Sequence, residues 1–189
     1  INNTLAYKAF SLSFLVDAKV GGTIYSATHK TGLYTGVLEE TLQGRDENHG
    51  GISYYYAGNT ASGGAIALPN AASAAPNGET VYHDGMVFDG VKADGSANGT
   101  IIPAQQYYQG LNNINEAHTF SATAVRLREV VIGYNLPAQW VKGIGMQSAR
   151  FSLTGRNLWI IHKNVPNIDP ETAFNTGNAQ GLEDLSLPT

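Results

Sequence analysis

The histidines and carboxylates of this chain are the residues that would carry metal or acid–base chemistry. Its five histidines are scattered, and none has the i,i+4 or HExxH spacing that brings two imidazoles to one face of a helix. Asp-Gly pairs recur at five-residue spacing, whereas a calcium loop needs oxygen ligands at alternate positions, so we interpret these pairs as turns. The residues concerned are His29, His49, His83, His118 and His162, and Asp84-Gly85, Asp89-Gly90 and Asp94-Gly95.

Two further carboxylate pairs, Glu39-Glu40 and Asp46-Glu47, are adjacent in the sequence. Neighbours on an extended chain point apart, which makes them poor partners in general acid–base catalysis. The chain contains no nucleophile elbow (G-x-S-x-G), no phosphate-binding loop and no cysteine. We therefore predict that it is not an enzyme and that it has no catalytic residue, no metal site and no cofactor.

Clustered tyrosines are the most interesting binding candidates. Tyr54, Tyr55 and Tyr56 are consecutive, and Tyr107-Tyr108 form a second group. Tyrosine rings stack on sugar rings or peptides and are common in protein interfaces, but they also pack well inside a fold. Packing within the local core, contact with a partner protein and contact with substrate are therefore all open for these five residues.

The composition narrows the class of protein. The chain has 189 residues, 22 of them glycine, and only 14% are charged, against about 25% in typical soluble domains. Such a mixture suits a β protein with long loops, or a transmembrane barrel with a polar inner wall. The net charge of −4 argues against a nucleic-acid partner. No apolar run approaches the ~20 residues that a transmembrane helix needs.

Alternating residues predict four strands, at about 1–6, 10–26, 123–136 and 149–161. Successive side chains of a strand point to opposite faces, so each of the longer strands has one apolar and one polar side. The apolar positions are Phe10, Leu12, Phe14 and Val16, then Val130, Ile132, Tyr134 and Leu136, and finally Phe151, Leu153 and Trp159. The last two strands form a β-hairpin whose connector includes a short helical turn, Ala138 to Lys142.

The connections between these strands alternate between short and long. Tyr7 to Ala9 and Pro137 to Gly145 are short, whereas about 30–120 and 162–189 are long and rich in turn residues. Outer-membrane barrels show this asymmetry, with tight periplasmic turns and long extracellular loops. Whether residues 60–80 are ordered stays open. About four strands cannot close a barrel, so we expect the chain to be part of a larger protein.

Several stretches resemble the C-terminal part of SusC/RagA-type TonB-linked outer-membrane transporters. The most specific are VRLREVVIGYNLP, which begins at Val125, and SARFSLTGRNLWI, which begins at Ser148. YKAFSLSFLVDAKVGGTIYS, HDGMVFDGVKADG, QQYYQGLNNINEA and NIDPE occur in the expected order and approximate spacing. The resemblance covers nearly the whole chain.

The resemblance implies an all-β fold: the C-terminal antiparallel strands of a large, 22-stranded transmembrane barrel with long extracellular loops. Such a protein lies in the outer membrane of a Gram-negative cell, in contact with its lipid. It imports oligosaccharides or peptides with energy from the TonB complex and works with a SusD-like surface lipoprotein. We expect the plug domain, the TonB-contacting segment and the closing strand after Pro188-Thr189 to lie outside this chain.

In that topology the polar side of each strand faces the lumen, which would place Arg150 and Arg156 there, free to form a salt bridge or to influence selectivity. Aromatic residues would mark the two rims of the membrane. Tyr25 and Trp159 would lie at the outer rim, and Tyr7, Tyr134 and Trp140 at the periplasmic rim. Arg126 and Arg128 would also lie near the outer rim.

The alternative is a soluble β-sandwich that binds carbohydrate or acts in adhesion. In that case the apolar side of residues 10–16 would pack face to face against Phe151, Leu153 and Trp159. An isolated chain that unfolds cooperatively without detergent would favour this alternative.

Overall fold

A computed structural model describes residues 1–173 and 177–186. It contains more strand than helix, 38% against 23%, which agrees with an all-β class. The chain forms two compact units: Ile1–Tyr25 with Phe120–Thr189, and Ser26–Thr119. We refer to them as unit 1 and unit 2.

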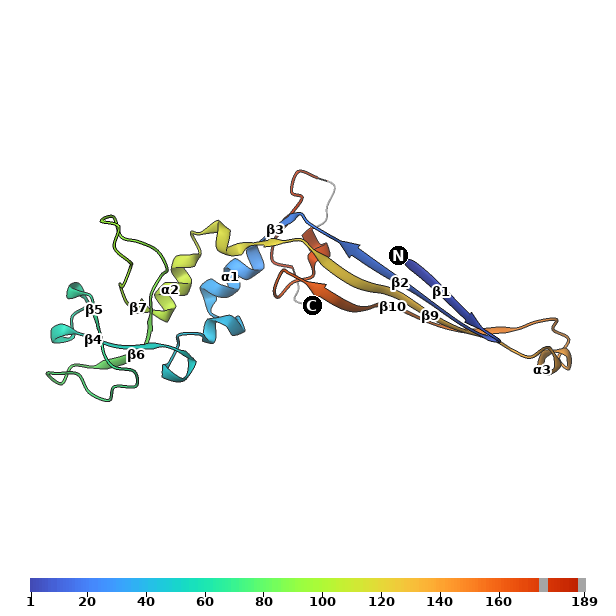
Figure 1. Ribbon diagram of the computed structural model, residues 1–189, viewed down its shortest axis with the longest axis horizontal. Coiled ribbons are helices and arrows are strands. Elements are labelled where there is room, and N and C mark those ends of the chain that lie inside the picture. Colours follow the sequence, from blue (N-terminus) through green and yellow to red (C-terminus); the bar gives the residue numbers. More distant parts are fainter. Residues whose placement is uncertain (174–176, 187–189) are drawn as a thin grey trace. The chain divides into compact units, whose positions relative to one another are not determined.

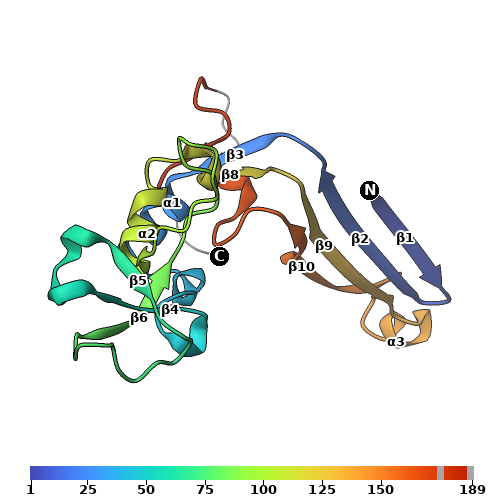
Figure 2. The ribbon, with the colours of Figure 1, turned by 60° about the vertical axis from the view of Figure 1, so that its left-hand side comes forward.

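Unit 1 is built on a four-stranded antiparallel sheet in the order β1-β2-β9-β10. Figures 1 and 2 show these strands side by side as a single layer. β1 and β2 are joined by a tight turn in which Lys8 has a positive φ of 52°. The helix α3 lies in the connector between β9 and β10. The bounds are β1 (Asn2–Tyr7), β2 (Phe10–Lys19), β9 (Ala124–Asn135), α3 (Ala138–Lys142) and β10 (Arg150–Lys163).

The strand predicted for residues 10–26 is in fact two strands, which corrects that prediction. β2 ends at Lys19, and β3 (Thr23–Ser26) belongs to a second sheet in the order β11-β3-β8. Gly21 and Gly22 separate them with φ values of 85° and 83°, a backbone conformation that leaves the extended region. The other strands of this second sheet are β8 (Thr119–Ser121) and β11 (Leu182–Glu183).

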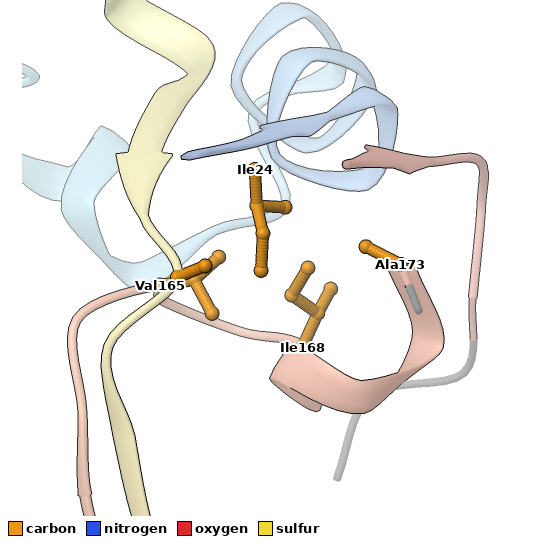
Figure 3. Close-up of a cluster of buried hydrophobic side chains, with 5 residues drawn as sticks. Ile24, Val165, Ile168 and Ala173 are labelled. Atoms are coloured by element: carbon orange, nitrogen blue, oxygen red, sulfur yellow. The ribbon is translucent and has the colours of Figure 1, made fainter. Parts of the chain in front are cut away.

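The core of unit 1 lies beside this second sheet. Ile24, Ala122, Val165, Ile168 and Ala173 are all at most 2% exposed and pack together, with Phe120 against them. Figure 3 shows the side chains of Ile24, Val165 and Ile168 pointing toward one another. Residues 162–173, predicted as loop, thus supply much of this core and include the 3-10 helix η6 (Pro170–Ala173). Pro188-Thr189, after which a closing strand is expected, lie outside the described residues.

Unit 2 shows that much of the predicted 30–120 loop is folded. Two helices pack through Leu33, Ala104 and Tyr108, with Leu38, Met86, Tyr107 and Leu111 around them. A separate sheet has the order β5-β4-β6-β7. The bounds are α1 (Ala27–Thr35), β4 (Ile52–Tyr56), β5 (Ala65–Ala67), β6 (Val81–Met86), β7 (Ile102–Pro103) and α2 (Ala104–Leu111), with 3-10 turns η1 (Glu39–Leu42), η2 (Glu47–His49), η3 (Ala57–Asn59), η4 (Ala61–Gly63) and η5 (Asn115–His118).

Local signals explain the ends of α1. The Ser26 hydroxyl accepts a hydrogen bond from the backbone N–H of His29 at 3.0 Å, which satisfies one of the free donors of the first turn. At the other end Gly36 adopts the left-handed conformation, φ 73°, and its N–H bonds back to Leu33. A glycine in this conformation is the usual end of a helix because it has no Cβ to clash.

Candidate functional sites

One face of the sheet in unit 1 is predominantly apolar, with Asn3 and Gly155 at its edges, and we call it the apolar face. Residues paired directly across neighbouring strands point to the same side, so the register defines its rows. The row nearest the short turns is aromatic on all four strands: Tyr7, Phe10, Tyr134 and Phe151. The next row is aliphatic: Leu5, Leu12, Ile132 and Leu153. Farther along lie Phe14, Val130, Val16, Leu127 and Trp159.

The apolar face is open to its surroundings. Phe151 is 71% exposed, Leu153 66% and Trp159 62%, and the other rows include residues exposed to a similar degree. A soluble sheet buries one apolar side against a second layer, whereas no residue of this face belongs to a buried cluster within the described residues. Exposure of this surface to water is therefore unfavourable.

The apolar face also tests the alternative that the chain is a soluble β-sandwich. That alternative requires the apolar side of residues 10–16 to pack face to face against Phe151, Leu153 and Trp159. The register places Phe10, Phe151 and Leu153 on the same side of one sheet, with β9 between β2 and β10. Side chains on one side of a sheet cannot oppose one another as two layers do, so the described strands β2 and β10 do not pack as this sandwich requires.

The opposite side, the polar face, carries small and hydrophilic residues, among them Ser11, Ser13, Gly133, Ser152 and Thr154. Arg150 and Arg156 are on this side, in register with Asn135 and Glu129. Arg150 donates to the Ser11 hydroxyl at 2.7 Å, and Arg156 forms an ion pair with Glu129 at 2.9 Å.

Gly133 makes the Arg150 contact possible. A Cβ at this position would lie 2.4 Å from Arg150 Nη2 and 2.5 Å from Ser11 Oγ. Without that Cβ, the arginine lies across the middle strand and reaches β2. The polar face is thus linked by hydrogen bonds from β10 through to β2.

An arginine–carboxylate network lies at the other end of the sheet, and the sequence patterns did not reveal it. Arg126 donates to Asp169 and lies 3.4 Å from Glu171. Arg128 donates to Glu171 and, at 3.0 Å, to Asp17. The network ties β2 and β9 to residues 169–171. The motif NIDPE holds two of its carboxylates, but nothing local indicates that arginines some 40 residues earlier would be their partners.

Irregular pairing puts Arg126 on the polar face. β9 carries one residue more than β2 between Val130 and Leu127, and β10 is irregular at the same level, where Asn157 has a φ of 51°. Such a bulge re-aims the side chains beyond it. Strict alternation would have put Arg126 with Val130 on the apolar face, whereas it pairs with Asp17 opposite. Leu127 takes the apolar position instead, in register with Trp159.

Asp169 stays ionised in this network. Burial acts to raise the pKa of its carboxyl, but the hydrogen bond from the Glu171 backbone N–H and the nearby Arg126 guanidinium outweigh that effect and hold the pKa below its usual range. The side chains of Asp169 and Arg126 are only 16% and 11% exposed. The pair is thus largely shielded from solvent, so removal of one partner would leave the other charge without its counter-ion in a poorly solvated place.

Of the tyrosines singled out in the sequence, Tyr54 is the most buried, at 1% exposure. Its ring stacks on Tyr82 at 5.3 Å and meets Tyr56 edge-on at 5.4 Å. Its hydroxyl donates to Asp84 at 3.0 Å. Burial, and then the Asp84 charge, raise the pKa of the Tyr54 hydroxyl. Tyr54 therefore packs inside unit 2, while Tyr55 is half-buried beside it on β4.

The second pair lies on α2. Tyr107 stacks on Phe88 with ring centroids 4.4 Å apart and is half-buried. Tyr108 is 9% exposed, and its hydroxyl is within donating distance of the Glu40 and Gln43 carbonyls, at 2.8 and 2.9 Å. Burial raises the pKa of the Tyr108 hydroxyl. Both rings thus help to hold α2 against its neighbours.

A cavity of about 570 Å³ in unit 2 brings Tyr108 and Asp84 together with residues that the sequence patterns did not single out. Leu33 and Ala104 are buried in its wall, and Tyr34, which is 49% exposed, also lines it. Its polar lining includes Arg45, Asp84, Gln105 and Gln109. Arg45 is held by carbonyls of Gly36 and Thr41 at 2.5 and 2.6 Å. The cavity can accept a small ligand with both apolar and polar surfaces.

The structure brings two of the scattered histidines together. His29 Nδ1 lies 3.1 Å from His118 Nδ1, and both rings are buried. Burial lowers the pKa of His118. Nowhere in residues 1–173 and 177–186 do three His, Cys, Asp or Glu side chains gather in a way that could hold a metal ion. Among the Asp-Gly pairs, Asp94 accepts hydrogen bonds from the Ser96 backbone and hydroxyl, which is turn geometry. Asp84-Gly85 instead lie within β6, where Gly85 pairs with Ile52 and Pro103, so the prediction of a turn there was wrong.

Part of the chain is similar to a known receptor. Over 67 residues the chain is 31% identical to the TonB-dependent receptor P3 of Formosa agariphila. The match covers 35% of this chain and 7% of that receptor, so the chain corresponds to a small part of the relative's length. No family model matches the chain. The similarity supports a relationship with TonB-dependent receptors in general.

Helices contribute no membrane span: none within the described part of the chain has the length and hydropathy to cross a bilayer.

Proposed function

We propose that this chain is part of the barrel wall of a SusC/RagA-type TonB-dependent importer in the Gram-negative outer membrane. The observation that carries the proposal is the apolar face, whose aromatic row and adjoining aliphatic row are exposed side by side. A barrel wall shows the same order, with an aromatic girdle at the membrane interface bordering an apolar band. The similarity to a TonB-dependent receptor is independent support.

Open sheet edges support a larger barrel. β1 and β10 each have one paired neighbour, β2 and β9 respectively, within the described residues. An unpaired backbone N–H or C=O in hydrocarbon costs several kcal/mol, so both edges require further strands of the same protein in a membrane. A 22-stranded barrel, as in the transporters that the chain resembles, would supply them. Its polar face would line the lumen, with Arg150 and Arg156 on that wall.

The length of the connectors indicates which end of the strands faces the periplasm. The turn at Lys8 and the connector that holds α3 lie at one end of the sheet. In barrels of this class that end faces the periplasm. Unit 2 would then be an extracellular excursion that contributes to substrate and partner contacts. Its cavity and the half-buried Tyr55, Tyr56 and Tyr107 are the places to look for such contacts.

In this proposal the whole protein imports oligosaccharides or peptides and takes its energy from the TonB complex, through a segment outside this chain. A SusD-like surface lipoprotein would be its partner on the extracellular side. The arginine–carboxylate network would hold residues 169–171 against the outer end of the wall, where loops meet the partner.

The test is affinity purification of the full-length protein from detergent-solubilised outer membranes. We expect it to be recovered from the outer-membrane fraction together with a surface lipoprotein. Recovery only from the soluble fraction would contradict the membrane assignment. Recovery from the membrane without a lipoprotein would contradict the SusC-type partnership while leaving a TonB-dependent receptor of another kind.

A further inference from the structure

The short-turn end of unit 1 is exclusively basic. Residues 1–16 and 130–163 contain none of the chain's 15 acidic residues, although its net charge is −4. Three cations lie at this end: Lys8 in the β1–β2 turn, Lys142 at the last position of α3, and Arg150 at the start of β10. None of them has an ion-pair partner within the described residues. Arg150 lies on the polar face, where it donates to Ser11, so we call Lys8 and Lys142 alone the basic end.

Exposed amphipathic and apolar side chains lie close to these cations in the sequence. Trp140, Ile144 and Met146, in the connector with α3, are 64%, 68% and 44% exposed. The Lys8 ammonium lies 5.3 Å from the centre of the Tyr7 ring, which belongs to the aromatic row. The cation therefore lies against the rim of the apolar face. A tryptophan beside lysines at the border of an apolar surface is typical of the membrane–water interface.

We propose that the basic end binds the headgroups of anionic phospholipids in the leaflet that meets the short turns. The proposal rests on the proposed function, because it takes the apolar face to be embedded in a bilayer. Phosphate groups lie where the aromatic row gives way to water, which is the level of Lys8 and Lys142. An ammonium group there gains from the negative surface potential without leaving water. The aromatic row and Trp140 fix the depth, and the cations select the headgroup.

Charge complementarity favours an anionic lipid over an acidic protein as the occupant. Lys8 lies by the ring of Tyr7 in the aromatic row, and Lys142 is in α3 with Trp140. The exposed side chains of the same connector include Trp140, Ile144 and Met146. Such apolar side chains would lie in the headgroup–acyl boundary. An acidic protein surface would leave them facing water or would have to supply a matching apolar patch.

The experiment uses the full-length protein in nanodiscs that contain equal amounts of phosphatidylglycerol and phosphatidylcholine. After partial delipidation, native mass spectrometry measures the ratio of the two lipids that remain bound. We expect phosphatidylglycerol to be enriched. The enrichment should fall about fivefold for each lysine removed by Lys8→Gln or Lys142→Gln, the ratio that corresponds to ~1 kcal/mol per cation. It should also weaken at high salt.

Lys92→Gln is the matched control, because it removes one exposed cation from unit 2 and should leave the enrichment unchanged. Equal enrichment in the wild type and in the Lys8→Gln/Lys142→Gln double variant would overturn the proposal, as would an equal loss in the control. Inorganic phosphate at millimolar concentration should not displace the lipid, and full displacement would show that the basic end is a site for free anions.

A photoactivatable phosphatidylcholine with the reactive group on its acyl chain separates this proposal from the proposed function. Cross-linking to Phe151 and Leu153 is expected if the apolar face is embedded, whatever the headgroup. No cross-link would contradict the proposed function itself. A cross-link without preference for phosphatidylglycerol would contradict only the headgroup proposal.

Discussion

Arg126 donates a hydrogen bond to the carboxylate of Asp169, a residue 43 positions farther along the chain. The two side chains are 11% and 16% exposed, and both contact Glu171, through its side chain and its backbone N–H respectively. The bond joins a strand of the proposed barrel wall to the segment that follows β10. The bond therefore helps to hold that segment in place against the sheet.

Replacing Arg126 by alanine should loosen residues 164–173. The change leaves Asp169 partly buried without its cation, at a cost of about 1–3 kcal/mol. Hydrogen exchange of the full-length protein in detergent should show faster exchange at Glu171 and Thr172. Arg156→Ala is the control, because Arg156 is 77% exposed and its ion pair with Glu129 should be worth ~0–1 kcal/mol. Equal effects of the two substitutions would contradict the role assigned to Arg126.

Acid should weaken the same contact. The pKa of Asp169 in the folded protein lies below its ordinary value of 3.8. Its contribution to stability is therefore complete above pH 3.8 and is lost as the pH falls through the folded pKa. Protection of residues 164–173, corrected for the intrinsic exchange rate, should drop over that range. In Asp169→Asn the drop should be absent, and an unchanged profile in this variant would assign the acid sensitivity to another carboxyl.

A new charge should reduce the yield of folded protein when it is placed on the apolar face of β10 and should be tolerated on the polar face. Leu153→Arg puts a guanidinium on the apolar face, which costs about 2–4 kcal/mol at the middle of a bilayer and less toward the interfaces. Thr154→Arg, one residue away, puts the same group on the polar face and should be tolerated. The measurement is the yield of folded protein in the outer membrane, read from heat-modifiable migration on gels. Equal tolerance at both positions would argue that the apolar face does not meet lipid.

Gly133→Ala should displace Arg150 from Ser11. The new Cβ would lie 2.4 Å from Arg150 Nη2, and the arginine can move away because its end is flexible. The expected loss is one hydrogen bond across β9, about 1 kcal/mol of unfolding free energy. Gly143→Ala is the control, since a Cβ there meets nothing within 4 Å. Denaturant titration in detergent compares them, and a larger loss at Gly143 would refute the argument.

Tyr54→Phe tests the packing of unit 2. The change removes the donor to Asp84 and keeps the stacked ring. We expect the local free energy of unfolding at β4 to fall by about 1–2 kcal/mol, because Asp84 is charged but only half-buried. Hydrogen exchange at the backbone of Ser53 and Tyr55 should report it. Tyr55→Phe is the matched substitution, because no hydroxyl bond of Tyr55 is found in the described part of the chain. If Tyr55→Phe had the larger effect, the assignment of Tyr54 to the core would be wrong.

The strand pattern could be predicted because it is local. Phe10 and Leu12, and likewise Phe151 and Leu153, alternate with polar residues. Such alternation predicts a strand with one apolar and one polar face. The short helix at Ala138–Lys142 was also visible in the sequence, since Pro137 marks its start. The break between β2 and β3 was missed, because Gly21-Gly22 permits either a bulge or an end.

By itself the sequence determined that the chain has amphipathic strands joined by alternately short and long connections, since both depend only on neighbouring residues. Only the tertiary structure decided that all the apolar sides share one exposed face, that Arg126 turns to the polar face, and that Tyr54 is buried while Tyr55 is not. These depend on register, and register is set by pairing between residues far apart in the chain, where one extra residue in β9 exchanges the two faces beyond it.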